Sequence, residues 1–150
     1  MRALVTWTLL VVGCGGGGNQ ADMGLSFNGN WSGSLMHPAT TCTDGSVKAA
    51  YAATTSFQIN QDQAGLFFIW SDRCPVAGNI SFGVDAMGTA RQQGDPVECL
   101  NTSFAQATMS GGVMTVAGGA LTLTINETEH DTGTQTRDCE WPITAMMTRQ

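Results

Sequence analysis

Hydrophobic and polar residues alternate along much of the chain after residue 26, which is typical of strands that bury one face. In the first such stretch one face carries Phe27, Gly29, Trp31, Gly33 and Leu35. The alternation recurs at residues 51–59, 76–84, 113–116, 121–125 and 139–147. No segment shows the sustained spacing of a helix, so we expect an all-β fold.

Turn-forming residues separate these strands. The clearest hairpin joins 113–116 to 121–125, because Gly118 and Gly119 accept the positive φ angles of a tight turn. A continuous apolar run at 66–70 suits a strand covered on both faces, and a further strand is expected to begin at residue 100. We therefore expect an antiparallel meander of about eight strands, a barrel or barrel-like, with a β-sandwich as the alternative.

Pro142 bears on whether such a barrel closes completely. It has no backbone N–H to give to a neighbouring strand and belongs on an edge strand or at a bulge. Its place in the last predicted strand argues against full closure.

The first fourteen residues follow a different pattern. Arg2 precedes an apolar run, Ala3 to Val12, and small Gly13 follows, in the order of a secretion signal. The run is too short for the roughly 20 residues that span a bilayer. Val11-Val12-Gly13-Cys14 resembles the lipobox of bacterial lipoproteins, where the cysteine is acylated and becomes the first residue. The alternative is an ordinary secretion signal in which Cys14 has no role.

The lipoprotein resemblance divides the chain into three parts. Residues 1–13 would be the signal peptide, residues 14–25 the lipidated Cys14 and a Gly-rich tether, and residues 26–150 a single β domain. In that family an aspartate directly after the cysteine favours retention at the inner membrane, whereas here Gly15 follows. The resemblance thus implies a bacterial cell-envelope protein that a lipid anchor holds at the outer membrane.

Four cysteines remain once Cys14 carries lipid, an even number that favours two disulfides in an oxidising compartment. Three pairings are possible. If the first and last strands are neighbours, Cys42 could meet Cys139, which leaves Cys74 to pair with Cys99. Zinc is the rival interpretation, but no two of these cysteines form the close pair that zinc sites usually show.

The charge balance argues against some partners. Without the signal the chain has five basic and twelve acidic residues, a formal net charge of −7. The basic residues are scattered, so neither nucleic acid nor an anionic lipid surface is an expected partner.

A second resemblance concerns the first strand. Gly29-Asn-Trp31 is similar to the Gly-x-Trp signature of lipocalin-like barrels, in which the tryptophan fills one end of the core. It implies a barrel that could hold a small apolar ligand. The many methionines could line such a cavity, although filling a core explains them as well.

No catalytic or metal site is expected. His37 and His130 fall in segments predicted as loops, and neither lies near a Gly-x-Ser-x-Gly nucleophile pattern. Glu127, Glu129, His130 and Asp131 offer possible ligands for calcium, but their spacing fits no EF-hand and a solvated acidic loop is the preferred interpretation. We expect neither a metal nor a cofactor.

The sequence thus favours a lipid-anchored, non-catalytic envelope protein that serves as a binding or structural module. The alternatives are a lipocalin-like carrier of a small apolar ligand and an envelope inhibitor of proteases or lysozymes. An enzyme is the least favoured of the four.

Overall fold

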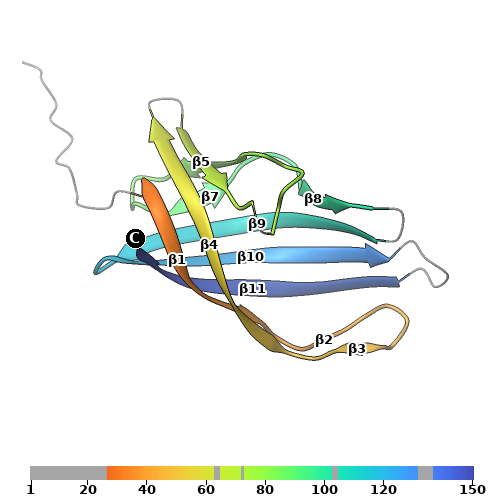
Figure 1. Ribbon diagram of the computed structural model, residues 1–150. Helices are drawn as coiled ribbons and strands as arrows, with labels where there is room; N and C mark the ends of the chain where they lie inside the picture. Colours follow the sequence, from red (N-terminus) through yellow and green to blue (C-terminus); the bar gives the residue numbers. More distant parts are fainter. Residues whose placement is uncertain (1–26, 63–64, 72, 103–104, 132–136) are drawn as a thin grey trace, which may run out of the picture.

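The computed structural model describes residues 27–62, 65–71, 73–102, 105–131 and 137–150. All regular elements in these ranges are strands, as the alternation predicts (Figure 1). The strands are β1 (Gly29–His37), β2 (Thr40–Thr41), β3 (Val47–Lys48), β4 (Tyr51–Asp62), β5 (Gly65–Ile69), β6 (Ile80–Val84), β7 (Ala90–Gln92), β8 (Val97–Asn101), β9 (Ala105–Ala117), β10 (Ala120–Asp131) and β11 (Arg137–Arg149).

Antiparallel pairing joins the strands in a ring. The order runs β10, β11, β1, β4, β5, β6, β7 and β9, and β9 pairs with β10 to complete the circuit. Within the described ranges the ring thus has eight strands, while β8 lies beside the first half of β9 and β2 and β3 form a separate hairpin. The expected all-β antiparallel architecture is confirmed.

Pro142 lies in the part of β11 that pairs with β10 but not with β1. Strand β1 pairs with β11 only from Thr144 to Arg149, whereas β10 also pairs with Pro142, through Asn126. The missing N–H therefore does not prevent the ring from closing, because closure uses the C-terminal half of β11.

Several predicted boundaries were wrong. The strand expected at 76–84 begins only at Ile80, and the one expected to begin at residue 100 is β8, which already begins at Val97. The short β7 and the β2–β3 hairpin were missed, since two or three residues show no periodicity. The hairpin at Gly118 and Gly119 is confirmed, with φ of 58° and 80°.

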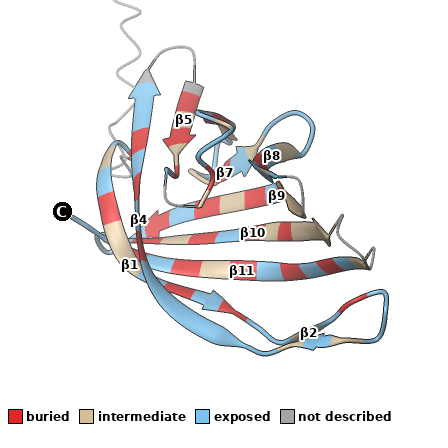
Figure 2. Cartoon of the chain, turned by 45° about the vertical axis from the view of Figure 1, so that its right-hand side comes forward, coloured by how far each residue is buried: buried red, intermediate tan, exposed pale blue. Residues whose placement is uncertain are grey.

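The interior is filled by alternate residues of the ring strands, and Figure 2 shows the buried and exposed positions interchanging along β9–β11. Its centre is an aromatic cluster in which Phe68 contacts Phe57, Trp70 and Phe82, with ring centroids 4.6 to 5.8 Å apart. Edge-to-face contacts at such distances are favourable. The Trp70 indole also donates to the Thr55 hydroxyl at 2.8 Å, so its polar atom is satisfied.

The ring has two unlike ends. We call the end with Phe27, Gln150 and the β9–β10 turn the terminal end, and the end with the β2–β3 hairpin and the start of β11 the polar end (Figure 1). At the terminal end Trp31 is 1% exposed, donates to the Phe27 carbonyl at 2.8 Å and lies 5.0 Å below the Arg149 guanidinium. The tryptophan is thus buried at this end of the ring, on the inward face that the strand pattern predicts.

Both disulfides have the expected connectivity. Cys42 is bonded to Cys139, and Cys74 to Cys99. The first joins the segment after β1 to β11, and the second joins the segment after β5 to β8. Each therefore attaches a connecting segment near the polar end to a strand, β11 in one case and β8 in the other.

Candidate functional site

The inner face of β10 changes character along its length. Leu121, Leu123 and Ile125 point into the core, and Glu127 and Glu129 continue the same face toward the polar end. The reason is that the ring strands differ in extent: β1 ends at His37 and β4 begins at Tyr51, while β10 and β11 continue toward the polar end. Beyond that level charged side chains line the interior, because only connecting segments cover it.

Arg73 is the centre of the buried part of this charged layer. Its Nη2 donates to Glu127 Oε2 at 2.7 Å and lies 2.8 Å from His37 Nε2, and its Nη1 donates to the Tyr51 hydroxyl at 3.2 Å. The side chain is 25% exposed, whereas that of Glu127 is 10% exposed. Arg73 therefore connects the segment after β5 to β1, β4 and β10.

His37 lies beneath Arg73. It is 1% exposed, its ring stacks on Tyr51 at 4.2 Å, and its Nδ1 accepts a hydrogen bond from the Trp141 indole. Burial and then the charge of Arg73 lower the pKa of His37 to about 4. The imidazole is consequently neutral at pH 7.

Burial affects the pKa values of Glu127 and Arg73, which form an ion pair, in different ways. Burial raises the pKa of Glu127, and the nearby charge of Arg73 only partly opposes this. Burial also disfavours the charged form of Arg73, but Glu127 and Tyr51 outweigh it and the pKa of the guanidinium rises. Each group thus depends on the other for its charge, as expected of a half-buried ion pair.

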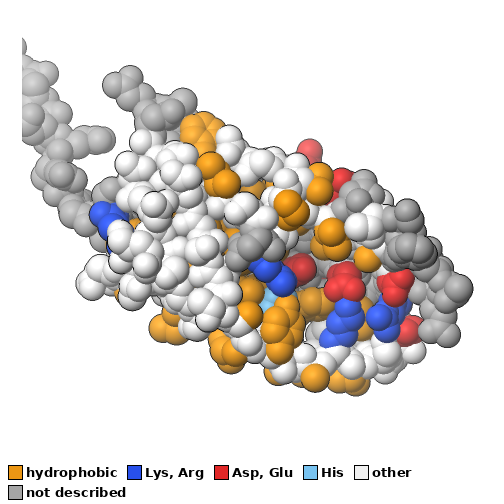
Figure 3. Space-filling model, in the orientation of Figure 1, with side chains coloured by type: hydrophobic (Ala, Val, Ile, Leu, Met, Phe, Trp, Pro, Cys, Tyr) orange, Lys and Arg blue, Asp and Glu red, His pale blue; other side chains and the backbone are white. Residues whose placement is uncertain are grey.

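Two further ion pairs lie along the same face of β10, beyond the pair of Arg73 and Glu127. Lys48 from β3 binds Glu129 and lies 5.4 Å from the centre of the Trp141 ring, and Arg137 Nε lies 3.6 Å from Asp131 Oδ2. Three acids on one face of β10 are thus matched by one base from each of three other segments. Figure 3 shows this charged group with hydrophobic side chains on either side of it.

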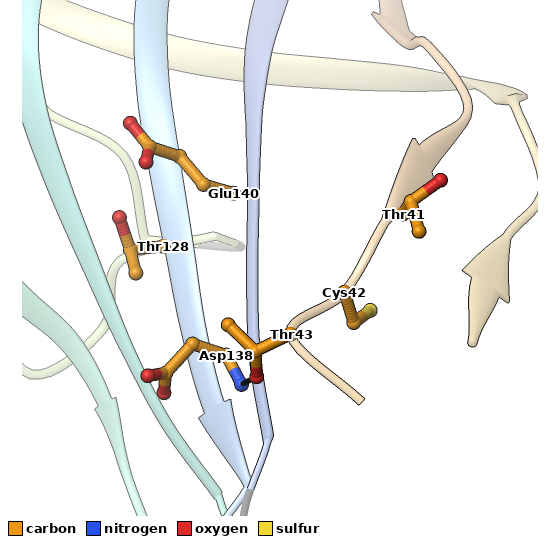
Figure 4. Close-up of a pocket in the computed structure, with 6 residues that line it drawn as sticks. All are labelled: Thr41, Cys42, Thr43, Thr128, Asp138 and Glu140. Carbon is orange, nitrogen blue, oxygen red and sulfur yellow. Dashed lines mark hydrogen bonds between the residues drawn. The ribbon is translucent and has the colours of Figure 1, made fainter. Parts of the chain in front are cut away.

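An open pocket of about 420 Å³ lies on the other face of the same strands. Figure 4 shows Thr128, Asp138 and Glu140 projecting to one side of the sheet, with residues 41–43 beside β11. The backbone of this segment is fixed to β11: Thr43 N–H donates to the Asp138 carbonyl and Asp138 N–H to the Thr43 hydroxyl, both at 2.9 Å. The pocket thus has polar walls on a rigid base.

The structure changes the interpretation of the histidines. His37 is not a loop residue but the buried last residue of β1, and His130 lies on β10, where it contacts Asp138. The segment 127–131 is likewise part of a strand, so a solvated acidic loop was wrong. Within the described ranges, no three His, Cys, Asp or Glu side chains are grouped so that they could hold a metal ion.

The sequence reasoning missed Arg73, Tyr51 and Trp141 as members of the polar cluster. Arg73 and Tyr51 carry no local signal, because their partners come from distant strands. Glu127 could have been found, since it continues the period of two from Ile125. Cys14, the predicted lipidation site, lies outside the described residues.

Comparison of the chain with protein-family models, with curated proteins and with solved structures finds no match. In the part of the chain that the structure describes, there is no helix of the length and apolar character that a membrane span requires.

Proposed function

We propose that this protein is a non-catalytic binding or structural module of the bacterial cell envelope, held at the outer membrane through a lipid on Cys14. The observation that carries the proposal is the use of the five cysteines. Four form two disulfides, which are stable in an oxidising compartment, and the fifth follows the apolar N-terminal run. An exported protein with a lipidated cysteine accounts for all five.

The two ends of the ring suit attachment to a membrane through the N-terminal side of the chain. The described chain begins at Phe27 at the terminal end, so an anchor on its N-terminal side would attach there. The polar end, with its charged layer and open pocket, would then be directed away from the attachment point. Residues 15–25 would serve as the spacer, and a Gly-rich segment of that length has a root-mean-square end-to-end distance of about 18 Å.

The test of the anchor is Cys14→Ala in the full chain. We expect the wild type to fractionate with membranes and to incorporate a radiolabelled fatty acid, and the variant to lose both properties. Cys42→Ala is the matched control, because it removes a cysteine of the domain and should leave the label in place. An unlabelled wild type, or a labelled Cys14→Ala variant, would contradict the proposal.

The filled interior argues against a role as a carrier of a small apolar ligand. The aromatic cluster of Phe57, Phe68, Trp70 and Phe82 occupies the space in which a carrier would hold an apolar ligand.

A fluorescent apolar probe separates a filled interior from the cavity of a carrier. With the interior filled, titration of 1-anilinonaphthalene-8-sulfonate into the native protein should give no saturable, one-to-one enhancement of fluorescence. A saturable one-to-one enhancement that an unlabelled fatty acid reverses would instead support the carrier.

The contacts of the two histidines support a non-catalytic role. His37 contacts Arg73, Tyr51 and Trp141, and His130 contacts Asp138. A hydrolase of the Ser-His-Asp type requires a nucleophile within hydrogen-bond distance of the imidazole. Purified protein should therefore release no product from ester or peptide reporter substrates above the rate of buffer.

A further inference from the structure

The outer face of β1 and β4 is polar but uncharged along much of its length. Residues 28–34 and 54–60 contain no acidic or basic side chain, although the chain has twelve acidic and six basic residues. Their outward positions carry amides and hydroxyls, among them Asn30, Ser56 and Gln58, and all three side chains are exposed. In Figure 3 the surface over β1 and β4 is accordingly mostly white, whereas the charged group described above lies toward the polar end.

A hollow of about 230 Å³ lies in this uncharged face, beside the terminal end. Asn30 lines it from β1, Ser56 and Gln58 line it from β4, and Ile69 and Ser71 line it from β5 and the residues that follow. In the strand register Asn30 is the partner of Gln58, and Gln58 is the partner of Ile69. Three neighbouring strands thus present one row of side chains to the hollow.

Gln150 forms a fixed rim on one side of the hollow. Its backbone N–H donates to the Asn30 carbonyl at 2.9 Å, and its side-chain Nε2 donates to the Ser32 hydroxyl at 2.7 Å. Its amide oxygen is an acceptor that these two hydrogen bonds do not use. The rim is therefore held in position without a ligand.

The polar side chains inside this rim are not used by the fold. In the part of the chain that the structure describes, the side chains of Asn30, Ser56, Gln58 and Ser71 make no hydrogen bond to another residue. An amide group both donates and accepts hydrogen bonds, and so does a hydroxyl. The hollow thus offers uncharged donors and acceptors that solvent or a ligand must satisfy.

The chemistry of this set favours a ligand rich in hydroxyl groups. Among the described residues that line the hollow none is charged, so it offers no ion pair to an anion or a cation. A sugar hydroxyl donates and accepts hydrogen bonds, as the lining side chains do. Phe67 and Ile69 are half-buried on the same outer face of β5, where they provide apolar surface for the C–H groups of a sugar ring.

A peptide is a poorer match for this position. Peptides that bind to sheets pair with the backbone of an exposed edge strand. At Gln58, strand β4 is already paired with β1 on one side and with β5 on the other. The backbone is therefore occupied at this level of the sheet, and a ligand meets side chains only.

We propose that the hollow binds a neutral sugar as one unit of a polysaccharide chain. The inference names a ligand for the binding role proposed above and rests on that role, but it does not require the lipid anchor. The hollow is smaller than the roughly 300 to 1,000 Å³ of pockets that enclose drug-sized ligands. It would therefore take a single sugar unit and leave the rest of the chain on the surrounding polar face.

The test is titration of the full chain with neutral trisaccharides of glucose, galactose, mannose and N-acetylglucosamine, followed by ¹H–¹⁵N NMR. Dodecylphosphocholine micelles are suitable, because this detergent contains no sugar. At least one trisaccharide should shift the backbone amide of Ile69 and the side-chain NH₂ of Gln150 with a saturable, one-to-one dependence. The anionic trisaccharide of galacturonic acid should bind at least tenfold more weakly, because the acidic domain repels it and the hollow offers it no cation.

Variants of exposed residues locate the site without disturbing the core. Asn30→Ala and Gln58→Ala each remove one unused amide and should weaken binding about three- to tenfold, and the double variant should show no saturable shift. Ser56→Trp should abolish binding, because its ring would occupy the hollow. Asn79→Ala is the matched control: it removes an exposed amide outside the hollow and should bind as the wild type does.

Three results would overturn the proposal. The first is that none of the four neutral trisaccharides gives a saturable shift, and the second is that the galacturonic acid trisaccharide binds as tightly as the best neutral one. The third is that the Asn30→Ala, Gln58→Ala double variant binds like the wild type, which would place the sugar elsewhere. Cys14→Ala should bind the sugar with unchanged affinity, so a failure of the anchor and a failure of the sugar site are distinguishable.

Discussion

The two halves of β10 show how one strand pattern serves two environments. From Leu121 to Ile125 the inward positions are apolar and fully covered, and from Glu127 to Asp131 they are acidic and each has a basic partner. The difference follows from two other strands of the ring, β1 and β4, which do not reach the polar end. Alternation alone therefore defines the strand, while the extent of the other ring strands decides what each inward position must be.

The same comparison predicts where substitutions will be most costly. At the terminal end stability comes from apolar burial, which a smaller side chain reduces. At the polar end it comes from covalent links and from charges that are tolerated only as pairs. The loss of stability from a substitution at the polar end should therefore depend on which charged partner remains unpaired.

The largest effect is expected from the disulfides of the polar end. Cys42 and Cys139 are 97 residues apart, and Cys74 and Cys99 are 25 apart. In the chain-entropy account, replacing both cysteines of a pair by Ala costs about 5 kcal/mol for the longer loop and about 3.5 kcal/mol for the shorter one. Denaturant unfolding of the two double variants measures this, and equal costs would weaken the entropic explanation.

Trp31→Ala tests the terminal end. It removes a fully buried ring and the hydrogen bond to the Phe27 carbonyl, so we expect a loss of about 3 to 5 kcal/mol in the free energy of unfolding. Trp31→Phe, which keeps an aromatic ring, should lose less. If Trp31→Ala left the unfolding midpoint almost unchanged, the terminal end would not be the packed end.

Glu127→Gln tests the paired charges. It leaves Arg73 half buried without its carboxylate, and we expect a loss of about 2 to 3 kcal/mol. Glu127→Gln combined with Arg73→Met should recover much of this loss, because both charges are then absent. A double variant as unstable as the sum of the single ones would refute the coupling, and thermal unfolding of the three variants decides it.

The pH dependence of stability depends on His37. Its pKa is lowered from 6.5 to about 4 in the folded protein, so the unfolded chain binds a proton more readily. The contribution of neutral His37 is therefore complete above about pH 6.5 and is lost as the pH falls toward 4, by up to about 3 kcal/mol. The raised pKa of Glu127 acts in the opposite direction, since it favours the folded state in acid.

Urea unfolding at a series of pH values isolates the contribution of His37 to the free energy of unfolding. The stability difference between the wild type and His37→Asn should shrink from pH 7 to pH 4. A difference that stays constant over this range would mean that His37 does not titrate differently in the two states.

The smallest loss of stability is expected from substitutions of exposed residues, beginning with the ion pair of Lys48 and Glu129. Lys48 and Glu129 are 30% and 26% exposed, so solvent screens their attraction, and Lys48→Met should cost less than about 1 kcal/mol. Met87→Ser, at an exposed turn of the terminal end, should be neutral within about 0.5 kcal/mol. A large loss from either substitution would show that the ranking of sites by burial is wrong.

Periodicity predicted the strand class and much of the ring, because apolar alternation reports directly on a covered face. It failed at Glu127 to Asp131, where the inward positions are charged and the strand reads as a polar loop. The contacts within the His37 cluster could not be predicted, since Arg73, Glu127 and Trp141 meet only through the closure of the ring. The disulfide pairing was accessible because it required only that the first and last strands be neighbours.

Native-state hydrogen exchange at pH 7 tests the contrast between the two ends most directly. Amides of β10 from Leu121 to Ile125 should exchange only through global unfolding, while those from Glu127 to Asp131 should exchange through a smaller opening with a lower free energy. Reduction of the disulfides should widen this difference. Equal protection along the whole of β10 would contradict the account.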